Sequence, residues 1–104
     1  MYILVLITAK DKEEAERIAT YMIKNNLAAC ANILGDINSI FWWKQNIERE
    51  QEILIILKTR KDKFPKIVST IKTIHSYSCP EVIAIPIIDG NKDYLNWLND
   101  NLCC

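Results

Sequence analysis

Three side chains near residue 80 have the chemistry to bind a metal ion together: His75, Cys79 and Glu81. They would supply nitrogen, sulfur and oxygen ligands, and imidazole and thiolate suit copper or zinc. His75 is the single histidine of the chain. The spacing of the three matches no recognised metal motif. The alternative interpretation is that His75 ends a helix, where its ring interacts with the helix dipole.

A fourth candidate ligand is Cys30, which lies in a strand-like stretch between Ala29 and Ala31. A buried free cysteine usually packs as a small apolar side chain, and a soft metal ligand is the second interpretation. None of the four cysteines forms a Cys-x-x-Cys pair, so the sequence predicts neither a zinc ribbon nor a redox motif.

Catalysis has little support in the sequence. The chain contains no second histidine, no G-x-x-x-x-G-K-[ST] phosphate loop and no G-x-G-x-x-G motif. A thiol enzyme that uses Cys79 with His75 is the one enzymatic possibility, and it would need an activated thiolate. We therefore predict a binding protein and no catalytic residues.

The composition is that of one domain spanning residues 1–104, half of them apolar. Its 13 basic and 13 acidic residues cancel, so the basic excess of a nucleic-acid-binding protein is missing. The basic stretch from Lys58 to Lys66 contains Asp62 and overlaps a helix start, which favours a solvated surface. No segment has the ~18 apolar residues that span a bilayer, and none resembles a signal peptide. We therefore expect a cytoplasmic protein with reduced thiols and no membrane partner.

The first 26 residues predict a strand and a helix. Residues 2–8 (YILVLIT) are apolar almost throughout, which is typical of a central strand covered on both faces. Asp11 and Glu14 have the spacing of a capping box at a helix start. The apolar stripe of this helix continues to Ile23, while Glu14 and the other charged residues are expected to face solvent. The Asn25-Asn26 pair can supply the left-handed residue that ends it.

Two long strands should follow, at 27–43 and 47–59. Gly35 and Asp36 indicate a bend or bulge within the first of them. Residues 44–46 are expected to form the turn of a hairpin, with Asn46 able to take a positive φ.

A second helix, a last strand and a terminal helix complete the chain. Asp62 is the predicted N-cap of the second helix, and Pro65 falls in its first turn, where a missing N–H does no harm. Strand 82–88 contains Pro86, which cannot donate to a sheet and therefore favours an edge position. Gly90-Asn91 opens the terminal helix.

This order of elements predicts an α+β, ferredoxin-like split βαβ fold (βαββαβ plus a C-terminal helix). Right-handed crossovers place the first and third strands in the centre of one mainly antiparallel sheet, with the helices on one face. A strand in such a sheet needs about five or six residues. The hairpin arms are far longer and should project beyond the helices.

The projecting tip carries Phe41, Trp42 and Trp43. Either the hairpin curls back and buries these aromatics in its own core, or another subunit covers them. We favour the second interpretation, because a bare edge strand beside an apolar patch invites pairing that a closed symmetric oligomer satisfies. The sequence therefore predicts an oligomer whose interface includes these three aromatics.

Several linked motifs resemble the CutA divalent-cation (copper) tolerance family. They are LAACANI at 27–33, SIFWW at 39–43, LKT at 57–59, HSY at 75–77 with Pro80-Glu81, and YLNW at 94–97. The resemblance covers nearly the whole chain in the right order. It implies a ferredoxin-like homotrimer built through the long hairpins, an architecture similar to the PII-type signalling trimers, and a link to copper and other divalent metals.

The resemblance also implies that residues from different strands meet at clefts between subunits. Lys58, Tyr77 and Glu81 are candidates: Lys58 to hold an anion or pair with Glu81, and Tyr77 to stack or donate a hydrogen bond. Cys30 would lie near the functional face of the sheet. The alternatives are an interface salt bridge without a ligand, or a PII-like signalling or scaffold trimer that binds an anionic metabolite or a partner protein. Lys44, Gln45, Ser76, Ser78 and Cys79 depart from the family pattern.

Overall fold

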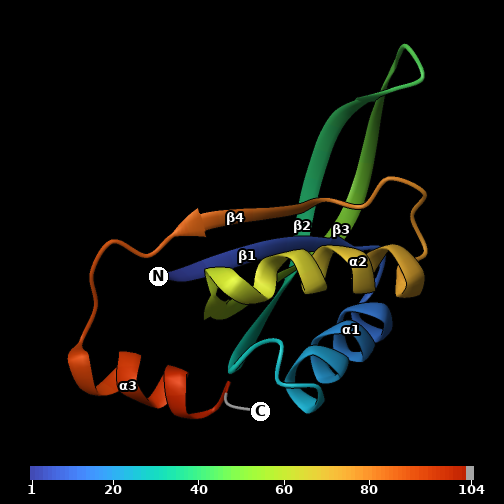
Figure 1. Cartoon of the computed structure of the whole chain (residues 1–104). Helices are drawn as coiled ribbons and strands as arrows, with labels where there is room; N and C mark the ends of the chain where they lie inside the picture. The colour runs from blue at the N-terminus through green and yellow to red at the C-terminus, as the bar shows by residue number, and fades with distance from the viewer. Residues whose placement is uncertain (103–104) are drawn as a thin grey trace.

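The computed structural model describes residues 1–102 and confirms the predicted order of elements and the ferredoxin-like α+β fold. The strands are β1 (Tyr2–Ala9), β2 (Cys30–Trp43), β3 (Asn46–Arg60) and β4 (Val82–Pro86). The helices are α1 (Lys12–Lys24), the 3-10 turn η1 (Lys61–Lys63), α2 (Phe64–Ile74) and α3 (Lys92–Asp100). The strands form one antiparallel sheet in the order β2-β3-β1-β4, so β4 lies at an edge as Pro86 predicts (Figure 1). Cys103 and Cys104 lie outside the described residues.

Helices α1 and α2 cover one face of the sheet (Figure 1). Alternate residues of the central strands point into this layer, so Ile7 of β1 and Ile55 of β3 are completely buried. They share one apolar core with Ile18 of α1 and Ile71 of α2. Burying one such side chain contributes about 1.5–3 kcal/mol, so this layer is the main source of stability in the body of the molecule.

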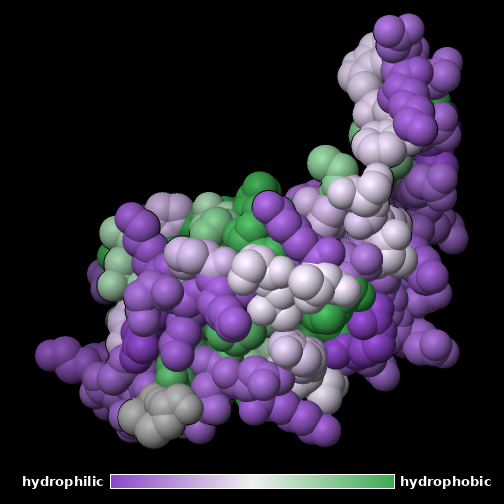
Figure 2. Space-filling view, turned by 45° about the vertical axis from the view of Figure 1, so that its right-hand side comes forward, coloured by the Kyte–Doolittle hydropathy of each residue, from purple (hydrophilic) through white to green (hydrophobic). Residues whose placement is uncertain are grey.

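The opposite face of the sheet is covered far less. Leu4 and Leu6 of β1 are half-buried, and their neighbours Ile85 and Ile83 on β4 are 41% and 49% exposed. The prediction that both faces of the first strand are covered is therefore wrong for a single chain, because α1 and α2 lie on the same side. Figure 2 shows hydrophobic atoms (green) at the surface of the body.

The ends of α1 confirm Asp11 as the N-cap and Asn26 as the left-handed residue, whereas the Glu14 carboxylate accepts the Lys10 N–H and not the Asp11 N–H of a capping box. Two side-chain placements also differ from prediction. Asp11 accepts a hydrogen bond from the Glu14 N–H at 2.8 Å, and Asn26 takes a φ of 56° after the last turn. Glu14 does not face solvent: it is 4% exposed, because its carboxylate turns toward the loop between α2 and β4. Met22 takes the buried position of the last turn, which leaves Ile23 39% exposed.

The start of α2 and the end of β4 also differ from prediction. Pro65 lies in the first turn as expected, but the N-cap is Lys63, without a side-chain hydrogen bond. Asp62 belongs to η1, and its carboxylate is held by the Arg60 guanidinium at 2.9 Å, so it does not cap the helix. Strand β4 ends at Pro86, short of the predicted Ile88.

The β2–β3 hairpin rises well beyond the helices (Figure 1). The predicted bulge is confirmed between Leu34 and Ile37, where the pairing register shifts. The turn is shorter than predicted: Trp43 pairs with Asn46, and Lys44 and Gln45 take φ values of 48° and 69°. Asn46 therefore belongs to β3 and not to the turn.

The hairpin does not curl back onto the body. Phe41, Trp42 and Trp43 are 38%, 72% and 42% exposed in the single chain. Figure 2 shows the hairpin with a pale side next to a strongly hydrophilic side. A hairpin this exposed lacks a packing partner within residues 1–102.

Candidate functional site

A cleft of about 810 Å³ lies along one side of the hairpin and is bordered by the loop that joins α2 to β4. Strand β3 supplies three of its carboxylates, Glu48, Glu50 and Glu52, because alternate residues of a strand point to the same face. The loop supplies Glu81, and Lys10 is the one lysine in the lining. The cleft therefore carries a concentrated negative charge.

The aromatic side chains of β2 line the same cleft. The register pairs Phe41 with Glu48 and Ser39 with Glu50, so each lies beside a carboxylate of β3. Trp42 and Trp43 complete the apolar part of the lining. This register follows from the bulge, since it moves the pairing by one residue beyond Leu34.

The carboxylates of the cleft perturb each other and their neighbours. The Tyr77 hydroxyl donates to Glu52 Oε2 at 2.7 Å, and burial together with this bond raises the pKa of Tyr77. Burial, and then the charge of Glu52, raise the pKa of Glu81. A cation that entered the cleft would offset both effects on Glu81, because it would stabilise the ionised carboxylate.

The structure brings some of the predicted site residues together. Tyr77, Cys79 and Glu81 line the cleft with the aromatics of the hairpin, and the Cys79 thiol is exposed. Cys30 and Lys58 pair with each other at the opposite end of the β2–β3 ladder. Lys58 Nζ lies 5.7 Å from the centre of the Tyr94 ring. Within one chain, therefore, Lys58 does not join Tyr77 and Glu81.

His75 lies behind the cleft, and its side chain is completely buried. Its Nε2 bonds to the Thr8 carbonyl oxygen at 2.7 Å, and its Nδ1 accepts a hydrogen bond from the Tyr77 N–H at 3.0 Å. Both ring nitrogens thus have protein partners. Within residues 1–102, no group of three or more His, Cys, Asp or Glu side chains is close enough to hold a metal ion.

Sequence reasoning missed the most acidic part of this site. Glu48, Glu50 and Glu52 recur at every second position of a predicted strand, and that periodicity was the available signal. Glu14 gave no such signal, because its partner Ser76 is 62 residues further along the chain.

No helix within residues 1–102 combines the length and hydropathy needed to cross a membrane. The chain spans nearly the whole length of several known proteins. It is 41% identical over 98 residues to the divalent-cation tolerance protein CutA of Thermus thermophilus, covering 94% of this chain and 95% of that protein. It is 40% identical over 99 residues to the chloroplastic protein CutA 1 of rice (Oryza sativa), covering 95% of this chain and 56% of that protein.

Solved structures agree with the sequence relatives. The periplasmic divalent cation tolerance protein CutA from Archaeoglobus fulgidus superposes with a TM-score of 0.95 at 43% identity, covering 98% of this chain and 99% of that one. The divalent cation tolerance protein from Thermus thermophilus gives a TM-score of 0.94 at 40% identity, with 97% and 98% covered. A family model described as CutA1 divalent ion tolerance protein matches residues 3–101. With the fold, the hairpin and these matches in agreement, the chain belongs to the CutA1 divalent ion tolerance family.

Proposed function

We propose that this protein is a homotrimer that binds divalent cations, copper among them, in the acidic clefts beside its hairpins. The observation that carries the proposal is the cleft itself, in which Glu48, Glu50, Glu52 and Glu81 are accompanied by one lysine. Like charges that line one cleft favour a bound cation, and the pKa of Glu81 is raised first by burial and then by the charge of Glu52. The family is named for tolerance of divalent ions and not for a reaction, which agrees with binding.

The uncovered apolar surfaces support the trimer. The half-covered sheet face and the exposed tip residues Phe41, Trp42 and Trp43 need a partner, and further copies of the chain in a closed ring would cover them without leaving a free edge. A cleft beside the hairpin would then lie next to a subunit boundary.

The predicted metal ligands fit this cleft to different degrees. Cys79 and Glu81 line it together with the β3 carboxylates, but no three such groups within residues 1–102 are close enough to hold one ion, so a neighbouring subunit would have to complete the ligand set. His75 would have to give up one of its two hydrogen bonds, and Cys30 lies at the far end of β2. We therefore assign the metal first to carboxylate and thiolate ligands. The free thiols of Cys30 and Cys79 suit a reducing compartment, and we propose the cytoplasm.

A PII-like trimer that binds an anionic metabolite remains the second hypothesis. Its anion would need a basic site, and Lys58 lies away from the cleft, next to Tyr94. The acidic lining of the cleft favours a cation there.

The test is a calorimetric titration of the full chain with Zn²⁺ and with Cu²⁺, together with its mass from light scattering. Cys103 and Cys104 are first changed to Ser, so that their thiols do not contribute. We expect a trimer that binds at micromolar concentration, and a loss of roughly tenfold or more in affinity for Glu52→Gln. Glu16→Gln, on the exposed face of α1, is the matched control. A trimer that responds only to anionic metabolites would instead support the second hypothesis, and a wild-type chain that binds neither ion would end the cation proposal.

A further inference from the structure

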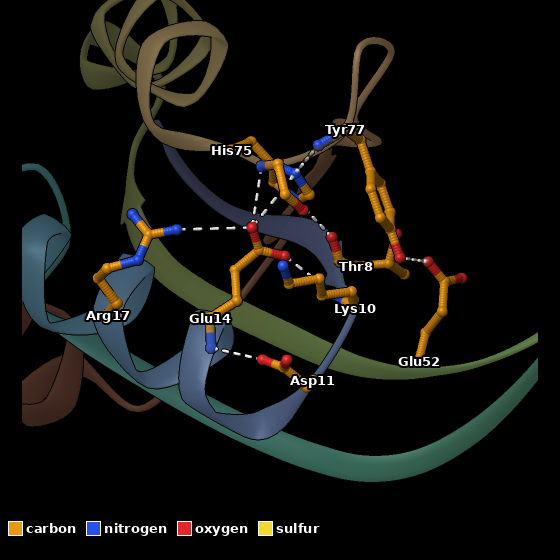
Figure 3. Close-up of polar contacts among 9 residues, drawn as sticks. Thr8, Lys10, Asp11, Glu14, Arg17, Glu52, His75 and Tyr77 are labelled. Atoms are coloured by element: carbon orange, nitrogen blue, oxygen red, sulfur yellow. Dashed lines mark hydrogen bonds and ion pairs between the residues drawn. The ribbon is translucent and has the colours of Figure 1, made fainter.

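Glu14 has an unusual position for the first turn of a helix, because its carboxylate is buried and connects two separate segments. Oε1 accepts the Lys10 N–H at 3.1 Å and Oε2 accepts the Ser76 N–H at 2.9 Å (Figure 3). Arg17 Nη2 lies 3.5 Å from Oε2. Glu14 thus links the end of β1 to the loop between α2 and β4.

The charge of Glu14 matters for this link. Burial alone raises the pKa of the carboxyl, but the hydrogen bonds from Lys10 and Ser76 outweigh burial and leave the pKa below its usual value. Each of its oxygens faces an N–H donor, and only a carboxylate offers acceptors on both sides. An amide in this place would turn its NH₂ group toward one of the two donors.

Ser76, which Glu14 holds, lies in the chain between His75 and Tyr77, and Tyr77 reaches the cleft. The His75 Nδ1 accepts from the Tyr77 N–H, so in this arrangement the ring proton is on Nε2 and is donated to the Thr8 carbonyl. Because Nδ1 carries no proton, its 3.9 Å approach to Glu14 is not an ion pair. The His75 and Tyr77 rings lie 4.7 Å apart, and Tyr77 then reaches Glu52 in the cleft.

We propose that Glu14 is a positioning residue: it anchors the loop at Ser76 so that Tyr77 holds Glu52 in place for the cation. The cation in this proposal rests on the proposed function, whereas the anchoring of the loop by Glu14 does not depend on it. One oxygen of Glu52 is fixed by Tyr77, while the other accepts no hydrogen bond from residues 1–102 and can serve a ligand. Figure 3 shows the side chains of this path, which runs from α1 through the loop to β3.

The first arm of the test measures the loop directly by amide hydrogen exchange on the full chain. Glu14→Gln should lower the protection of the Ser76 and Tyr77 amides by about tenfold or more, because their acceptors are lost or displaced. Ile18→Val, a core change on the same helix, is the control and should leave these two amides protected. If Glu14→Gln does not fold, Glu14→Asp keeps the charge but loses reach, and it should show the same local loss.

The second arm measures Zn²⁺ affinity in a double-mutant cycle with Tyr77→Phe. Glu14→Gln alone should weaken binding by roughly tenfold, in the range of residues that support metal ligands. In the Tyr77→Phe background it should cause little further loss, because the path to Glu52 is already broken. A residue that acts on the cation independently of Tyr77 would give additive losses, whereas Ile18→Val, which changes only the core, should give none.

The two arms separate the possible failures. Unchanged protection of the Ser76 and Tyr77 amides would overturn the positioning role, and additive losses of affinity would overturn the path through Tyr77. If the wild-type chain binds no cation while Glu14→Gln still exposes the loop, the proposed function fails. The anchoring of the loop by Glu14 then stands by itself.

Discussion

Strands β2 and β3 run through two regions that differ in what covers them. In the body, Ile55 and Leu57 of β3 are completely buried beneath the helices. Beyond the bulge, Ile47 of β3 and Ile40 and Trp42 of β2 are each more than half exposed. The strand pairing resumes after the bulge and continues to Trp43 and Asn46, so backbone hydrogen bonds do not make the difference. The body folds around its own core, whereas the exposed apolar residues of the hairpin contribute little to the stability of a single chain.

The largest expected effect comes from emptying the body core. Ile55→Ala should lower the free energy of unfolding by about 2–5 kcal/mol, because it leaves a cavity under α1 and α2. Ile40→Ala removes the same atoms from the hairpin, where the side chain is 62% exposed. Urea unfolding at a concentration where the chain is monomeric should show a change for Ile40→Ala within about 0.5 kcal/mol. Equal losses of unfolding free energy for the two variants would contradict the claim that the body and the hairpin differ in how well they are covered.

The next effect concerns the assembly. Trp42→Ala should weaken subunit association by about 2 kcal/mol or more, as expected for a central aromatic of an interface. Sedimentation over a range of concentrations measures this. Trp97→Ala on α3 is the control, because Trp97 has a comparable size and is 45% exposed. If the wild type stays monomeric, or if both variants dissociate equally, the hairpin is not the assembly element.

Acid should weaken the junction between the two regions. The pKa of Glu14 is lowered from its usual 4.5, so its contribution is full above that pH and disappears as the pH falls through the folded-state value. At pH 7 the free energy of unfolding of the wild type should be about 1–3 kcal/mol higher than that of Glu14→Gln, and this difference should shrink below pH 4.5. Unfolding curves at several pH values test this. Glu13→Gln, on the exposed side of α1, should show no such gap, and a gap that stays constant with pH would contradict the role of the charge.

The smallest expected effect is a gain at the hairpin turn. Gln45 has a φ of 69°, a conformation that costs an L-residue about 1–2 kcal/mol and glycine far less. Gln45→Gly should therefore stabilise the hairpin by about 1 kcal/mol. Asn46→Gly should not, because Asn46 is paired within β3. The melting temperature and the amide exchange at Trp43 measure the stability of both variants. If only Asn46→Gly were more stable than the wild type, the turn would include Asn46, as the sequence predicted.

Features encoded by neighbouring residues were predictable. Asp11 and Glu14 indicated the start of α1, Gly35-Asp36 the bulge, and Pro86 the edge strand. Each depends on a local conformational preference or on a missing donor, so a few adjacent residues determine it. The family resemblance predicted the fold through several such motifs in order.

Features that depend on distant contacts were not predictable. His75 meets the Thr8 carbonyl 67 residues away, and this contact decides which of its nitrogens carries a proton. Glutamate is usually a surface residue, and Glu14 is buried only because the loop between α2 and β4 passes over it. Asn46 is a better turn former than Lys44 or Gln45, but the register imposed by the bulge overrides that local preference.

The bulge also constrains how the gene of this protein can change in length. Gly35 and Asp36 together face the single residue Ile53, and beyond them Phe41 lies opposite Glu48. Deleting one codon here would remove the bulge but keep the pairs beyond it, because a single residue would then face Ile53 and Ile37 would still face Glu52. Phe41 would stay opposite Glu48, and the loop would keep its two residues. A codon lost from β2 beyond Ile37 would instead bring Trp42 opposite Glu48 and lengthen the loop to residues 44–46, so that the aromatics would change sides relative to the carboxylates. This hairpin should therefore tolerate the loss of a residue at the bulge better than a loss elsewhere in the outer part of β2.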